Sequence, residues 1–145
     1  MSTSETKPVT TDLKALIKLP LTSSIISTVL GIIILIIGVT VFASWIYAMV
    51  MYLLVGLMLL IFAIIGTFRL SKANDVTRAG EVCITHGWWI FSTGVGGIMV
   101  YVAPFFTKEA PALGALAAIA SALAMVLGLI IVIHAKRKMG VRLTV

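Results

Sequence analysis

The apolar residues of this chain form long uninterrupted runs, not the alternating pattern of half-buried strands. No charged residue occurs between Lys18 and Arg69. One straight helix of that length would extend roughly 75 Å, whereas the hydrocarbon core of a bilayer is about 30 Å thick. The run must therefore turn back once, and Ala43-Ser44-Trp45 is the natural place because Trp favours the headgroup level. The pattern predicts two membrane-crossing helices, at about 22–43 and 45–68.

The second half of the chain repeats this arrangement. After a polar segment at 69–85, two further runs without charge cover 82–107 and 110–135, separated only by Lys108 and Glu109. Their cores, about 86–106 and 111–134, are each long enough to cross a membrane. We therefore predict an all-α membrane protein with four transmembrane helices in two hairpins, at 22–68 and 86–135.

Composition supports lipid as the main solvent. Hydrophobic residues make up 61% of the 145 residues and charged residues 11%, whereas soluble domains contain about 25% charged residues. These figures exclude an ordinary soluble domain and a disordered chain. Residues 1–21 are polar by comparison and contain a short amphipathic stub at 11–19, which Pro20 is expected to interrupt before the first span.

The positive charges predict the orientation. All Lys and Arg residues except Lys108 fall on one side of the four-span arrangement, and by the positive-inside rule this side is the cytoplasm. Both termini, the loop at 69–85 and the basic tail at 136–145 are therefore expected on the cytoplasmic face of the cell membrane. The residues concerned are Lys7, Lys14, Lys18, Arg69, Lys72, Arg78, Lys136, Arg137, Lys138 and Arg142.

The spans contain little catalytic chemistry. None of them holds a charged residue, which argues against ion-coupled transport and acid–base catalysis and favours a protein that is not an enzyme. His86 and His134 would lie at similar depth in an antiparallel hairpin and could ligate a haem between helices, although histidines at span ends also suit contact with headgroups. Cys83 lies three residues before His86, but no third group accompanies the pair. We expect no cofactor, no metal and no nucleic-acid partner.

Small residues at helical spacing predict close helix packing. In lipid, small side chains let helix backbones approach, and this is a main source of helix association. The third and fourth spans carry most of these positions and are expected to pack tightly together, whereas the first two should expose more surface to lipid. The candidate packing residues are Gly31, Gly38, Ser92, Thr93, Gly96, Gly97, Gly114, Ala118, Ala122 and Gly128.

The two hairpins are loosely alike, and their glycine pattern resembles a known family. The second contains Gly87-Trp88-Trp89, Gly94, Gly96-Gly97, Pro104-Phe105 and a small-residue stretch at 112–124; the first contains Gly31, Gly38, Trp45, Gly56 and Gly66. From Gly31 to Lys138 this resembles the repeated hairpin of the HdeD family of membrane proteins. Members of that family often have three hairpins, and the first hairpin here lacks the usual outer-turn proline.

The resemblance implies a non-enzymatic protein of acid or general stress resistance, associating as a homo-oligomer through small-residue helix faces. The alternative is an accessory structural subunit of a larger membrane complex of respiratory, photosynthetic or monooxygenase type. A small transporter or channel and a haem protein are the remaining hypotheses. Each of these predicts different partners: a second copy, a larger assembly, a solute or a haem.

Overall fold

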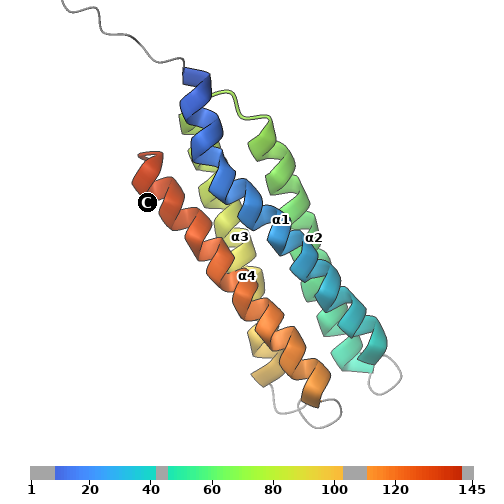
Figure 1. Cartoon of the computed structure of the whole chain (residues 1–145). Coiled ribbons are helices and arrows are strands. Elements are labelled where there is room, and N and C mark those ends of the chain that lie inside the picture. Colours follow the sequence, from blue (N-terminus) through green and yellow to red (C-terminus); the bar gives the residue numbers. More distant parts are fainter. Residues whose placement is uncertain (1–8, 42–45, 103–110, 142–145) are drawn as a thin grey trace, which may run out of the picture.

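The computed structural model describes residues 9–41, 46–102 and 111–141, and almost all of them are helical. The helices are α1 (Val9–Val41), α2 (Ile46–Ser71), α3 (Val76–Val102) and α4 (Pro111–Lys138). They form an elongated antiparallel bundle in which the start of α1, the α2–α3 connection and the end of α4 lie toward the same end (Figure 1).

The bundle consists of two hairpins. The most extensive contacts join α1 with α2 and α3 with α4, while α2 with α3 and α1 with α4 make smaller contacts that hold the hairpins together. Each helix contributes a fully buried aliphatic side chain to the shared core: Ile34, Leu59, Ile90 and Ile131. The predicted all-helical fold with hairpin pairing is confirmed.

Three helices are long and apolar enough to cross a membrane: Asp12–Thr40, Met49–Ser71 and Ala112–Lys138. Their large aliphatic side chains remain exposed along the outside of the bundle, which suits lipid and not water. The chain is therefore a multi-pass helical membrane protein. Among the described residues, α1 and α2 carry more of the exposed large apolar side chains than α3 and α4, as the sequence predicts.

Helix α3 differs from the other three. It corresponds to the predicted third span but is not among the helices apolar enough to cross a membrane by composition. Its buried face contains glycines and two polar residues, His86 and Thr93, whereas its charged residues Arg78 and Glu81 are exposed.

The predicted interruption at Pro20 is wrong. Helix α1 continues through Pro20, so the expected stub at 11–19 is the first part of the membrane helix itself. Proline normally disrupts a helix because it has no N–H to donate to the carbonyl four residues earlier. A contact from α4 compensates for this loss.

The predicted loop at 69–85 is also shorter than expected, because α2 extends through Ser71 and α3 begins at Val76. The Asp75 carboxylate caps α3 by accepting a hydrogen bond from the Arg78 backbone N–H at 2.7 Å. The first turns of α3 then place Ala79 and Cys83 on one face, buried in the core. The expected turn at 43–45 and the Lys108–Glu109 turn lie outside the described residues.

Candidate functional site

A set of polar side chains lies inside the apolar bundle. Buried polar groups are stable only when hydrogen-bonded, and several of these satisfy themselves within their own helix. Ser27 donates to the Ser23 carbonyl at 2.9 Å and Ser121 to the Ala117 carbonyl at 2.8 Å. Thr93 likewise donates to the Trp89 carbonyl. These bonds leave no hydroxyl proton of the three side chains free for chemistry.

His86 makes a contact of another kind, across the bundle. Its Nε2 lies 2.6 Å from the Ser24 Oγ, which joins α3 to α1. The ring also lies against Gly66 of α2. His86 therefore hydrogen-bonds to α1 and packs against α2.

Gly66 makes room for this histidine. A Cβ placed at Gly66 would overlap the His86 ring, so no larger residue fits unless the ring moves. The Ser24–His86 bond thus depends on a glycine in a third helix, which sequence reasoning did not include among the packing residues.

His134 compensates for the proline in α1. Its Nε2 lies 2.8 Å from the Leu16 carbonyl, which is the acceptor that an N–H at position 20 would use. Since Pro20 has no N–H, His134 supplies the donor from α4. This explains how α1 continues through a fully buried proline.

The two histidines that could ligate a haem each contact α1. Both Nε2 atoms are engaged with protein groups, Ser24 for His86 and Leu16 for His134. Cys83 is a free thiol buried in the core cluster. Within the described ranges, no group of three or more His, Cys, Asp and Glu side chains could hold a metal ion.

Five of the ten predicted packing residues lie at contacts between helices. A Cβ on Gly31 would meet the Leu60 nitrogen at 3.0 Å, and one on Gly128 would meet the Gly87 carbonyl oxygen at 2.6 Å. Gly38 lies against α2, Gly97 against Ser121, and Gly114 more loosely against Tyr101. Thr93 is buried, Ala118 and Ala122 are half-buried and Ser92 is exposed, while a Cβ on Gly96 would meet none of the described atoms within 4 Å.

Three glycines that the predicted packing set omits also lie at these contacts. Gly56 faces Gly31 across α1 and α2, Gly87 faces Gly128, and Gly94 lies against the backbone of Ser121 and Met125. Their spacing in the sequence does not predict these contacts, because each contact depends on which residue of the neighbouring helix lies opposite the glycine.

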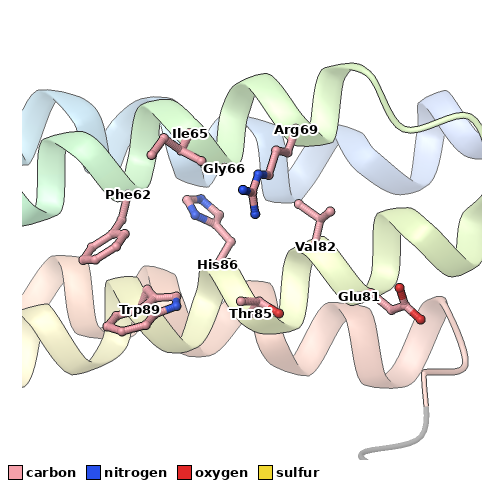
Figure 2. Close-up of a pocket in the computed structure, with 9 residues that line it drawn as sticks. All are labelled: Phe62, Ile65, Gly66, Arg69, Glu81, Val82, Thr85, His86 and Trp89. Atoms are coloured by element: carbon pink, nitrogen blue, oxygen red, sulfur yellow. The ribbon is translucent and has the colours of Figure 1, made fainter.

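A cavity of about 280 Å³ opens between α2 and α3, beside His86. Phe62 and Trp89 form its apolar end, with their rings stacked at 4.6 Å. In Figure 2 the Arg69 guanidinium reaches from α2 into the space between the helices, and Glu81 lies farther along α3. The full lining is Phe62, Ile65, Gly66, Arg69, Glu81, Val82, Thr85, His86 and Trp89.

A second cavity, of about 410 Å³, adjoins the first at the end of the bundle where α2 joins α3. It shares three lining residues with the first cavity and adds two more cations. Its lining is Phe68, Arg69, Lys72, Arg78, Glu81 and Val82. In the sequence, the charges of this segment recur every three residues, at Arg69, Lys72, Asp75, Arg78 and Glu81. This spacing favours a solvated turn with local ion pairs and does not by itself indicate a cavity.

Comparisons with protein-family models, curated proteins and solved structures gave no match. The geometry on its own defines the class: a small multi-span helical membrane protein with a hydrogen-bonded interior and a cavity that is charged at one end.

Proposed function

We propose that this chain is a non-enzymatic integral membrane protein that works by associating with a second copy of itself through the outward face of α3. One observation carries the proposal. Gly96 is the helical glycine whose added Cβ would meet nothing within 4 Å among the described residues, and Ser92, one turn earlier, is exposed. The other helical glycines are in contact inside the bundle.

A glycine in the interior of a helix has a cost. It destabilises the helix by about 1 kcal/mol relative to alanine, so it suits a site where another backbone must approach closely. A second small residue four positions away lies on the same helix face and extends the surface that another backbone can approach. Such pairs are enriched at helix contacts in membranes. Ser92 and Gly96 therefore suit docking of another helix.

Four membrane crossings with both termini in the cytoplasm complete the proposal. Helices α2 and α4 are each apolar enough to span, and α3 runs antiparallel between them within the bundle, which supports a return crossing by α3. The described cations of α1, α2, α3 and α4 that flank the spans gather toward one end. This asymmetry supports the cytoplasmic placement of that end.

Substitution of Gly96 by Leu tests the association. Labelled wild-type chains reconstituted in liposomes are expected to show energy transfer between copies, and Gly96→Leu is expected to abolish it by blocking backbone approach. Thr40→Leu, also at an exposed helical position, is the matched control and should behave as wild type. Absence of transfer in the wild type, or unchanged transfer in Gly96→Leu, contradicts self-association.

The physiological role that we propose is resistance to acid or general stress, as in the HdeD family that the hairpins resemble. Survival of cells carrying Gly96→Leu at low pH, compared with cells carrying the wild type and Thr40→Leu, tests this role. If the Ser92–Gly96 face instead retains a different membrane protein during purification, and Gly96→Leu releases it, the chain is an accessory subunit.

A further inference from the structure

We propose that the two cavities between α2 and α3 form one binding site for an anionic phospholipid. The phosphate would lie at the charged end, near Arg69, and one acyl chain would extend toward Phe62 and Trp89. This inference does not depend on self-association through Ser92 and Gly96, which lie outside both cavities.

The charged end suits a phosphate. Arg69, Lys72 and Arg78 line the outer cavity together with one carboxylate, that of Glu81, so cations exceed anions. The guanidinium group presents several N–H donors in a plane and matches a phosphate with two parallel hydrogen bonds. The Lys72 ammonium lies 4.1 Å from the centre of the Phe68 ring, which holds this second cation over the same end of α2.

The polarity then changes along the helices in the way that a phospholipid requires. Arg69 lines both cavities, and Phe62 lies two helical turns earlier on α2, roughly 10 Å deeper along the axis. Ile65 and Trp89 line the same deep part. A ligand that fits both parts must be anionic at one end and apolar over the next several carbon atoms. A free phosphate would leave the apolar part empty.

The position of the site in the membrane agrees with this ligand. The cations lie near the end of α2 and the start of α3, at the boundary between the apolar bundle and the polar connection. This is the level of lipid headgroups, and clusters of Lys and Arg there are attracted to anionic leaflets. The space between α2 and α3 is open toward the outside of the bundle at Thr85 and Ile65, which are exposed, so a lipid can enter sideways.

A hydrogen bond across the bundle holds the inner wall of the site. His86 faces the cavity beneath Gly66 (Figure 2), and its ring is fixed from behind by Ser24. The glycine widens the space between α2 and α3 where a side chain would otherwise fill it. A wall held by a cross-bundle hydrogen bond keeps the cavity open when no lipid is bound.

Binding of lipid to the delipidated full-length protein in detergent tests the proposal, with native mass spectrometry as the readout. Phosphatidylglycerol is expected to bind saturably and about tenfold more tightly than zwitterionic phosphatidylcholine, while diacylglycerol, which lacks the phosphate, should not bind. Excess inorganic phosphate should not displace the lipid. Equal binding of all three lipids overturns the proposal, and displacement by phosphate shows a free-anion site instead.

Two pairs of variants locate the site. Arg69→Gln is expected to weaken phosphatidylglycerol binding about tenfold, whereas Arg137→Gln, which removes an exposed cation outside both cavities, should leave it unchanged. Thr85→Trp should weaken binding by filling the deep cavity with all charges intact, and Thr77→Trp, exposed and outside the cavities, should not. Wild-type binding by Arg69→Gln or Thr85→Trp, or an equal loss in either control, overturns the site.

Discussion

Single glycines determine which side chains this bundle can hold inside. Gly66 provides the space for the His86 ring, and His86 in turn bonds to Ser24 in α1. A polar ring in an apolar interior is stable only while it is hydrogen-bonded. One glycine without a side chain thereby supports a contact between two other helices.

Replacement of Gly66 by Ala should destabilise the protein through this contact. The added methyl group would overlap the His86 ring and force it away from Ser24, and overpacking of this kind costs about 1–3 kcal/mol. Thermal unfolding in detergent measures the effect. Thr40→Ala, at an exposed helical position, is the control and should leave stability within about 0.5 kcal/mol of wild type. Equal melting temperatures for Gly66→Ala and wild type would refute the role of Gly66.

At this scale, the sequence predicts which residues are small but not what they face. Gly31 and Gly128 could be placed on packing faces from spacing alone, since close approach is the usual use of small residues in lipid. The partner of His86 could not be predicted, because Ser24 lies 62 residues away in the chain and the contact depends on how α1, α2 and α3 pack.

At the scale of the helix, α1 depends on α4 for its continuity. Pro20 deprives the Leu16 carbonyl of its donor within the helix, and His134 provides another at 2.8 Å. The rule that proline interrupts a helix is local, whereas the compensating donor comes from the other end of the chain. That is why the sequence predicts an interruption that the structure does not contain.

A double-mutant cycle tests this compensation. His134→Ala should destabilise the protein, by about 0.6 kcal/mol if it follows the average for hydrogen bonds inside membranes. In a Pro20→Ala background the same change should cost much less, because the new N–H at position 20 bonds to the Leu16 carbonyl. Reversible unfolding of the four proteins gives the coupling between the two sites. The same cost of His134→Ala in both backgrounds would show that the histidine acts by some other contact.

At the start of α3, the structure has a helix where the sequence predicts a loop. The alternating charges of 69–85 favour a solvated turn, but Ala79 and Cys83 recur at helical spacing and Asp75 provides a cap. This apolar pattern is weak because charged residues lie between its positions. Because α3 begins early, Glu81 and Thr85 come to line the cavity with residues of α2.

For the whole molecule, the lengths of the apolar runs were sufficient to predict two hairpins. The first run is long enough for two crossings and each of the other two for one, so few other arrangements are possible. The cavity could not be predicted in the same way, because it lies between α2 and α3, which belong to different hairpins. Its size depends on how the two hairpins pack against each other.

The orientation of the molecule is the prediction that belongs to this largest scale. The α2–α3 connection lies at the end of the bundle where the described cations gather, so we expect it in the cytoplasm. A cysteine introduced at the exposed Asn74 tests this, since the native Cys83 is fully buried and should contribute little background. In intact cells a membrane-impermeant thiol reagent should leave Asn74→Cys unlabelled and should label Lys108→Cys, which is expected on the outer side. In inverted vesicles the two results should exchange. Labelling of Asn74→Cys in intact cells would reverse the orientation, and it would then place the proposed phospholipid site in the outer leaflet.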